Sequence, residues 1–224
     1  MHNAFLACGG GETDMPEKLK IDPESQVAPL FATPVALITL PGHKKLNPAI
    51  ERAVLDKARR STGMKRSNVG GWHSDLDLLH WPVPEIRQLA EMVADAATHY
   101  CGLLLNQATV EGKLSMQAWA NVCRRGNFHK AHCHPNWHLS AAYYVNVGKP
   151  VADWPESGTF EFSDPRTPAR MQTLDGASFG RPHLIYPENG QLLLFPSWME
   201  HSVNPYQGPG HRISIAFNMR FAKA

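Results

Sequence analysis

The sequence predicts a mainly β domain with flanking helices packed outside it, and three observations support this class. Helical periodicity is confined to the part of the chain before Asn106, and short apolar runs of strand length follow it. These runs are bounded by Gly, Pro, Asn or Asp, and the 224 residues include 18 prolines and 17 glycines. Helices followed by six or more short strands indicate an antiparallel sandwich or barrel.

Two helices are expected in the first half of the chain. The first is expected to begin at Asn47 as a capping residue, with Pro48 in its first turn, and to fade by residues 61–63. Pro84 starts the second helix, whose apolar side chains recur at helical spacing as far as Tyr100. Both apolar stripes are expected to face the core.

Strands are expected before and after these helices. Residues 30–41 form the first, and residues 64–82, between the helices, are expected to form a loop with two tryptophans. The later strands are predicted at residues 114–122, 138–147, 158–163, 191–195, 201–206 and 211–221. No repeat or linker divides residues 30–224, which are expected to form one domain, and the polar residues 1–29 are expected to be an N-terminal arm.

Composition and charge argue against several classes of protein and partner. Hydrophobic residues make up 43% and charged residues 19% of the chain, which excludes a mostly disordered protein. The formal net charge of +2 and the lack of a long Lys/Arg run argue against a nucleic-acid partner, and no apolar run is long enough to cross a membrane. The four cysteines form no CxxC pair, which favours a reduced, cytoplasmic location. The arm and the exposed strand edges lead us to expect a homodimer.

Four of the 12 histidines fall within ten residues: His129, His132, His134 and His138. Because successive side chains of an extended chain point to opposite faces, His132 and His134 are expected on one side, where they could hold a metal ion. The best third ligand is His201, at the start of a later strand. Two adjacent ligands and one distant ligand leave positions open on the metal, which is typical of a reactive centre.

Other interpretations of these histidines remain open. His129 and His138 are expected to flank the pocket as substrate contacts. Alternatively, the four clustered histidines could bind a zinc ion together. His201 could instead be a surface histidine in a turn.

The last predicted strand carries a candidate seat for a carboxylate. Arg212, Ser214 and Asn218 share one of its faces, and a guanidinium with a hydroxyl one pleat away suits bidentate binding of a carboxylate. The short interval between His201 and Arg212 suits a hairpin in which their two strands are neighbours. The alternative is an exposed arginine in a cross-strand ion pair.

Further candidates for substrate contact lie on an earlier strand and on the Gly-rich loop. Trp119 and Asn121 share a face with Gln117, which suits the lining of a cavity. Trp72 and His73 could close over a substrate, although a loop tryptophan can equally fill the core.

As a set, these motifs resemble the Fe(II)/2-oxoglutarate-dependent oxygenase superfamily, and more narrowly a bacterial group of 2OG-Fe(II) oxygenases with an HxHP metal strand. The matching segments cover nearly the whole chain. They are Phe31-x-Thr33-Pro34-Val35, Gly71-Trp72-His73-Ser74, Trp119-x-Asn121, His132-x-His134-Pro135, Leu139-Ser140-x3-Tyr144-Val145, Phe162-x-Asp164-Pro165-Arg166, Leu194-Phe195-Pro196-Ser197-Trp198-x2-His201 and Arg212-Ile213-Ser214-x2-Phe217-Asn218.

The resemblance implies a double-stranded β-helix core of the jelly-roll or cupin-like kind. It also implies a non-haem Fe(II) ion on His132, His134 and His201, chelated by 2-oxoglutarate, with O2 as co-reactant. The superfamily usually has Asp or Glu in place of His134, so a centre with three histidines would be more cationic. The residues implied for 2-oxoglutarate are Arg212, Ser214, Tyr144 and Asn218.

The activity implied is that of a hydroxylase. Its substrate is expected to be a small polar or amino-acid-like molecule rather than a protein, oxidised at an unactivated C–H bond. Two other classes remain open: a three-His metal dioxygenase that does not use 2-oxoglutarate, and a metal-binding barrel without enzymatic activity. Arg212 and Ser214 favour the oxygenase, because neither alternative needs a carboxylate seat.

Overall fold

The structure is a computed structural model that describes residues 20–22, 24, 27, 30–107, 112–149, 151–171 and 180–222. The chain divides into two units, Met1–Thr33 and Pro34–Ala224, and the description below concerns the second. Most of the predicted N-terminal arm, residues 1–29, lies outside the described residues. That arm therefore stays a prediction.

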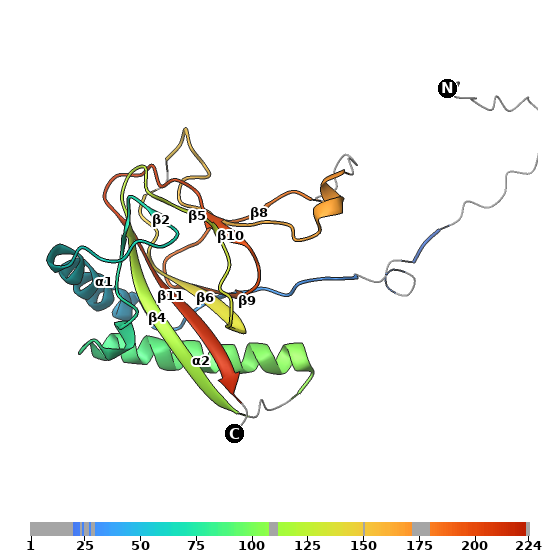
Figure 1. Ribbon diagram of the computed structural model, residues 1–224, viewed down its shortest axis with the longest axis horizontal. Helices are drawn as coiled ribbons and strands as arrows, with labels where there is room; N and C mark the ends of the chain where they lie inside the picture. Colours follow the sequence, from blue (N-terminus) through green and yellow to red (C-terminus); the bar gives the residue numbers. More distant parts are fainter. Residues whose placement is uncertain are drawn as a thin grey trace, which may run out of the picture. The chain divides into compact units, whose positions relative to one another are not determined.

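Two sheets form the body of the second unit, and every pairing between their strands is antiparallel (Figure 1). The first sheet has the order β1 (Ala36–Thr39), β9 (Gln191–Pro196), β6 (Leu139–Asn146), β11 (Arg212–Ala222), β4 (Lys113–Cys123) and β3 (Trp72–His73). The second has the order β2 (Asn68–Val69), β5 (Phe128–His132), β10 (His201–Val203), β7 (Phe160–Phe162) and β8 (His183–Ile185).

Two α-helices, α1 (His43–Arg60) and α2 (Pro84–Leu105), pack against the six-stranded sheet (Figure 1). Two short 3-10 helices, η1 (Leu78–His80) and η2 (Thr167–Met171), lie in connections. The described helices include no stretch long and apolar enough to cross a membrane.

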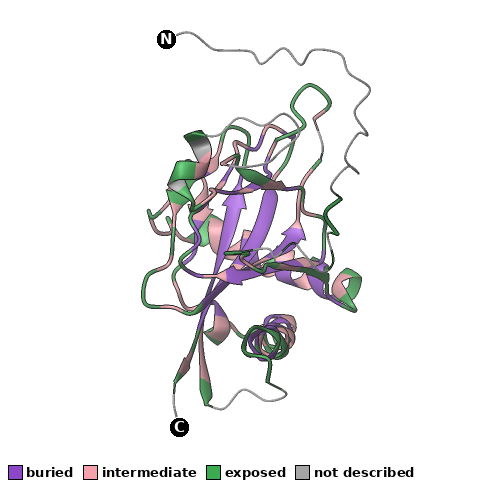
Figure 2. Ribbon diagram, turned by 90° about the vertical axis from the view of Figure 1, so that its right-hand side faces the viewer, coloured by how far each residue is buried: buried purple, intermediate pink, exposed green. Residues whose placement is uncertain are grey.

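Side chains of the long strands alternate between two faces, and each face packs in a different part of the interior. On β11, Ile213, Ile215, Phe217 and Met219 are buried in one apolar cluster with the helices. The intervening side chains of β11 face the five-stranded sheet, and Figure 2 shows the buried strands in purple at the centre of the view. A second apolar cluster lies between the sheets and consists of Tyr144, Phe160, Phe162, Ile185, Leu193, Phe195, Met199 and Val203.

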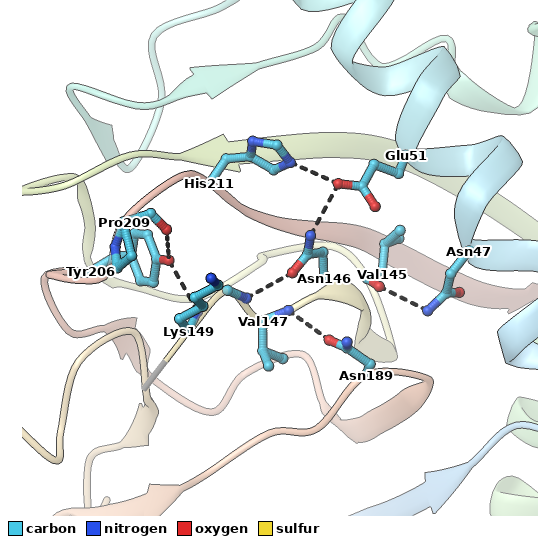
Figure 3. Close-up of polar contacts among 11 residues, drawn as sticks. Asn47, Glu51, Val145, Asn146, Val147, Lys149, Asn189, Tyr206, Pro209 and His211 are labelled. Carbon is cyan, nitrogen blue, oxygen red and sulfur yellow. Dashed lines mark hydrogen bonds and ion pairs between the residues drawn. The ribbon is translucent and has the colours of Figure 1, made fainter. Parts of the chain in front are cut away.

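The predicted class, mainly β with helices packed outside, is confirmed, but the predicted start of the first helix is wrong. Helix α1 begins at His43, after Gly42 in a left-handed conformation with φ of 71°. Asn47 does not cap it, because its side chain is used elsewhere: Nδ2 donates to the Val145 carbonyl at 2.8 Å (Figure 3). Its Oδ1 accepts from the Tyr143 hydroxyl at 2.6 Å, so Asn47 joins α1 to β6.

Two other predictions need correction, and one strand was missed. Residues 64–82 contain β2, β3 and η1 instead of an irregular loop, because strands of two residues leave no periodicity to detect. Strand β8 was not expected. The predicted hairpin of the His201 and Arg212 strands is wrong, because β10 pairs with β5 and β7, whereas β11 pairs with β4 and β6. The connection between them crosses from one sheet to the other.

Replacing Asn47 by alanine is expected to lower the free energy of unfolding by roughly 2–4 kcal/mol, because the buried Val145 carbonyl and Tyr143 hydroxyl would both lose a partner. Urea denaturation followed by circular dichroism measures the change. Lys45→Ala, on an exposed position of the same helix, is the control and should change stability by less than about 0.5 kcal/mol. Equal losses in the two variants would contradict a structural role for these hydrogen bonds.

Candidate active site

Three histidines converge in the wall of a cavity. The ligand nitrogens of His132, His134 and His201 all lie within 4.8 Å of one another, close enough to share one metal ion. His132 ends β5, His201 begins β10, and the two residues are partners in the ladder between these strands. His134 follows β5 and is held by its backbone N–H, which donates to the Ser197 carbonyl at 2.9 Å.

A β-bulge brings a fourth histidine to the same cavity. His132 pairs with His201, but His129 pairs with Val203, so β5 has one residue more than β10 across this interval. Side chains three residues apart would face opposite sides of a regular strand, yet His129 and His132 both line the cavity.

Hydrogen bonds determine which nitrogen of two of these rings is available to a metal. Nδ1 of His132 lies 2.7 Å from the Lys130 carbonyl, and Nδ1 of His201 lies 2.9 Å from the Met199 carbonyl. A carbonyl oxygen only accepts, so each Nδ1 carries the proton and each Nε2 presents a lone pair. The Ser67 hydroxyl lies 3.3 Å from Nε2 of His132 and 3.4 Å from Nδ1 of His129.

Burial keeps the three imidazoles neutral at neutral pH. It lowers the pKa of His201 to about 3 and the pKa of His134 to about 4, and it also lowers the pKa of His132. Repulsion from the neighbouring ring of His132 lowers the pKa of His201 and His134 further. Neutral imidazole is the form that binds a metal.

The three histidines line a cavity of about 520 Å³, a volume within the usual range for a site that binds small molecules. No Asp or Glu of the described chain lines it. The alternating inner faces of three central strands supply ten of its lining residues: Gln117, Trp119 and Asn121 from β4, Ser140, Ala142 and Tyr144 from β6, and Arg212, Ser214, Ala216 and Asn218 from β11.

Arg212 is the buried charge of this cavity. Its side chain is only 2% exposed, no carboxylate of the described residues pairs with it, and its Nε has no hydrogen-bond partner. The guanidinium carbon lies 5.2 Å from the centre of the Tyr144 ring, and the buried hydroxyl of that tyrosine is also without a partner. A buried cation without a counter-charge is costly, so this end of the cavity is suited to an anion.

Two features of the chain hold Arg212 in place. A Cβ at Gly158, where φ is +69°, would lie 3.1 Å from Cδ of Arg212, so glycine is needed where the backbone passes this side chain. His211 Nε2 lies 2.7 Å from Glu51 Oε1, which also accepts from the Asn146 side chain at 3.0 Å (Figure 3). These contacts tie the start of β11 to α1 and β6.

The other predicted residues divide into two groups. Trp119, Asn121, His73 and His129 line the cavity, and the rings of His73 and Trp119 stack with centroids 5.5 Å apart. Asn218 also lines it, and its Oδ1 accepts from the Ser140 hydroxyl at 2.8 Å.

Two predicted contacts lie elsewhere. His138 is exposed, and its Nδ1 accepts from the backbone N–H of Phe221 at 3.3 Å, because it stands just before β6 rather than inside the sandwich. Trp72 packs against the helix side of the sheet and donates from Nε1 to the Ser61 carbonyl at 3.1 Å. Among the described residues, the histidines that gather are 132, 134 and 201, so the alternative cluster of 129, 132, 134 and 138 does not form.

Sequence reasoning missed Arg66, Ser67 and Lys130, which also line the cavity. They come together because β2 pairs with β5 and the Lys130 N–H donates to the Ser67 carbonyl at 3.0 Å. Strand β2 has only two residues, so no pattern in the sequence indicated this pairing.

The metal-free protein is expected to lose stability as the pH falls below about 6.5. The unfolded chain binds protons on its histidines near that pH, whereas His201 and His129 in the folded protein do so only near pKa values of about 3. Urea unfolding in the presence of a chelator, at a series of pH values, measures the slope. His201→Gln should reduce it by up to about 1.4 kcal/mol per pH unit. His138→Gln is the control, and equal slopes in both variants would contradict the assignment.

Comparison with known proteins gives one match to a family model. Residues 117–218, less than half of the chain, match the family model described as "Putative 2OG-Fe(II) oxygenase". This range contains the three converging histidines and Arg212. No curated protein matches the chain in sequence.

Solved structures of low sequence identity share the fold. A Pseudomonas putida prolyl-4-hydroxylase superposes with a TM-score of 0.60 at 17% identity, over 85% of this chain and 94% of its own. A Trichoplax adhaerens prolyl hydroxylase, in complex with a hypoxia inducible factor peptide, superposes with a TM-score of 0.58 at 15% identity. This match covers 84% of this chain and 83% of the hydroxylase. HygX from Streptomyces hygroscopicus, with nickel and 2-oxoglutarate bound, superposes with a TM-score of 0.54 at 13% identity. This match covers 85% of this chain and 84% of HygX.

The fold of these structures is the double-stranded β-helix that the resemblance implied, with two antiparallel sheets facing each other. The description of the matching family model names 2-oxoglutarate and Fe(II). Residues 117–218 are therefore similar to the 2OG-Fe(II) oxygenase family.

Proposed function

We propose that this protein uses Fe(II), 2-oxoglutarate and O2 to hydroxylate an unactivated C–H bond of a small molecule. The observation that carries the proposal is the presence, in one cavity, of three converging neutral imidazoles and a buried guanidinium without a counter-charge. The first group suits a divalent metal with open positions, and the second suits a carboxylate.

The donor set fits a metal ion. His132, His134 and His201 are neutral at neutral pH, and two of them present Nε2 because Nδ1 donates to a backbone carbonyl. We assign these three side chains as the metal ligands. Three protein ligands leave further positions for 2-oxoglutarate and O2.

The cavity also fits 2-oxoglutarate. Arg212 Nε and the Tyr144 hydroxyl are buried polar atoms without partners, so a carboxylate between them would satisfy both. Burial raises the pKa of Tyr144 to about 12, so its hydroxyl keeps its proton and can donate to such a ligand. We assign Arg212, Ser214 and Tyr144 to the distal carboxylate, while Asn218, already bonded to Ser140, shapes the floor beside them.

When bound, the metal and 2-oxoglutarate supply the oxidising power of the reaction. The chain's own contribution is orientation and exclusion of water. Phe160 and Phe195 pack on His201 with ring centroids 5.1 and 4.9 Å away and so hold this ring in one orientation. Tyr144 and Phe195 close the cavity floor from the apolar cluster between the sheets.

One observation favours a second candidate. A donor set made only of imidazoles, without a carboxylate, would also suit a metal dioxygenase that does not use 2-oxoglutarate. Such an enzyme would have no use for the buried Arg212, which is why we prefer the 2-oxoglutarate-dependent reaction. A metal-binding barrel without activity is the remaining alternative.

Three measurements separate these functions. Anaerobic addition of Fe(II) and 2-oxoglutarate should produce a visible metal-to-ligand charge-transfer band. Oxygen uptake and succinate formation should both require 2-oxoglutarate. Oxygen uptake without 2-oxoglutarate would favour the second candidate, and tight metal binding without any turnover would favour the inactive barrel.

His201→Ala is expected to weaken metal binding at least tenfold, because it removes one of three ligands. Calorimetric titration of the chelator-treated protein with Mn(II) or Zn(II) measures this. His138→Ala removes an exposed histidine outside the cavity and should leave the affinity unchanged. If both variants bind metal as the unmodified protein does, His201 is not a ligand.

Arg212→Met is expected to weaken 2-oxoglutarate binding by roughly 1.5–3 kcal/mol, since it removes charge-assisted hydrogen bonds but keeps an unbranched apolar side chain. Equilibrium titration of the metal-loaded protein with 2-oxoglutarate gives the affinity. Arg220→Ala removes an equal charge from an exposed position of the same strand and serves as control. Unchanged affinity in Arg212→Met would remove this residue from the site.

A further inference from the structure

The charges that line the cavity all have the same sign. Arg66, Lys130 and Arg212 contribute positive charge, and no Asp or Glu of the described residues lines the wall. Arg212 is buried at the inner end, whereas Arg66 and Lys130 are exposed side chains at the boundary with solvent. The cavity therefore has two separate cationic regions, one deep and one near the mouth.

The fold places the two mouth residues together. Arg66 immediately precedes Ser67, whose carbonyl accepts from the Lys130 N–H at 3.0 Å, and the β2–β5 ladder continues from there. Within the described part of the chain, no carboxylate forms an ion pair with either side chain. Both charges are thus available to a ligand.

Arg66 and His73 line the same cavity. Burial lowers the pKa of His73, and repulsion from Arg66 lowers it further. His73 stacks on Trp119 and donates from Nδ1 to the Ser74 carbonyl at 2.6 Å, so its Nε2 is the nitrogen left for a ligand. A flat aromatic wall thus lies next to the mouth cations.

The charges of the proposed cofactors do not neutralise this region. With three neutral histidines, the charges of a divalent metal and a dianionic 2-oxoglutarate would cancel, and under the proposed function Arg212 would hold the distal carboxylate. Arg66 and Lys130 then remain as positive charge around the space left for substrate. An anionic substrate would be attracted there, whereas a cationic one would be repelled.

We propose that the substrate is a small organic acid, whose carboxylate binds between Arg66 and Lys130 while its body lies along the His73–Trp119 wall. This inference rests on the proposed function and extends it from a polar substrate to an anionic one. A small acid is favoured over a protein chain because 2-oxoglutarate and substrate must share about 520 Å³.

Matched pairs of ligands test the sign of the charge. The probes are N-acetyl amino acids and the corresponding N-acetyl amino-acid amides, which differ mainly by the carboxylate. Binding is measured by ligand-observed NMR on the full chain loaded with Zn(II), which prevents turnover, and with saturating 2-oxoglutarate, which occupies Arg212. We expect the acids to bind about tenfold or more tightly than their amides.

Charge-neutralising variants test the location. The double variant Arg66→Gln/Lys130→Gln should abolish the preference for acids. The double variant Lys65→Gln/Arg125→Gln removes the same total charge from exposed positions that do not line the cavity, and it should keep the preference. Thermal melting of both variants checks that they fold.

Each outcome has a defined meaning. Equal binding of acids and amides, failure of every acid to bind at millimolar concentration, or an acid preference that survives Arg66→Gln/Lys130→Gln would overturn the inference. A separate titration of the Zn(II)-loaded protein with 2-oxoglutarate tests the proposed function. If 2-oxoglutarate does not bind in that titration, the proposed function fails. In that case Arg212 is free to bind an acid, so the loss of the acid preference in Arg66→Gln/Lys130→Gln, and not the preference alone, tests the inference.

Discussion

Strand β11 lies between β6 and β4 in the six-stranded sheet, and each of its faces meets a different environment. One face carries Ile213, Ile215 and Phe217 into the apolar layer beneath the helices, and the other carries Arg212 and Ser214 into the cavity. A shift of one residue in register would exchange these faces and would bury the guanidinium among the helices. The position of the site therefore depends on the same alternation that builds the core.

The burial of Arg212 is the costly element of this arrangement. Its side chain is surrounded by protein, Gly158 leaves room for it, and the contacts of His211 with Glu51 hold the strand just before it. A cation in such a place is tolerable when an anion completes the site. This requirement agrees with the proposed function, in which a carboxylate of 2-oxoglutarate would supply the anion.

The positions of the histidines depend on a different feature, the β-bulge in β5. Alternation alone would place His129 and His132 on opposite faces, and the bulge in β5 brings both of them inward. The same strand carries Lys130 and pairs with the segment that contains Arg66 and Ser67. The bulge between β5 and β10 and the pairing of β5 with β2 thus bring the converging histidines close to Arg66, Ser67 and Lys130.

Local patterns in the sequence were sufficient for the fold class, for most of the longer strands and for the residues on the inner faces of β4 and β11, because alternation and helical spacing are properties of neighbouring residues. The convergence of His132, His134 and His201 could be expected from their spacing and from the resemblance. Sequence reasoning did not find the short strands β2 and β8, the role of Asn47 in joining α1 to β6, or the cavity positions of Arg66 and Lys130. It also placed β10 beside β11 and His138 beside the pocket. Those features depend on which distant segments pair and on where the chain crosses between sheets, and only tertiary packing decides that.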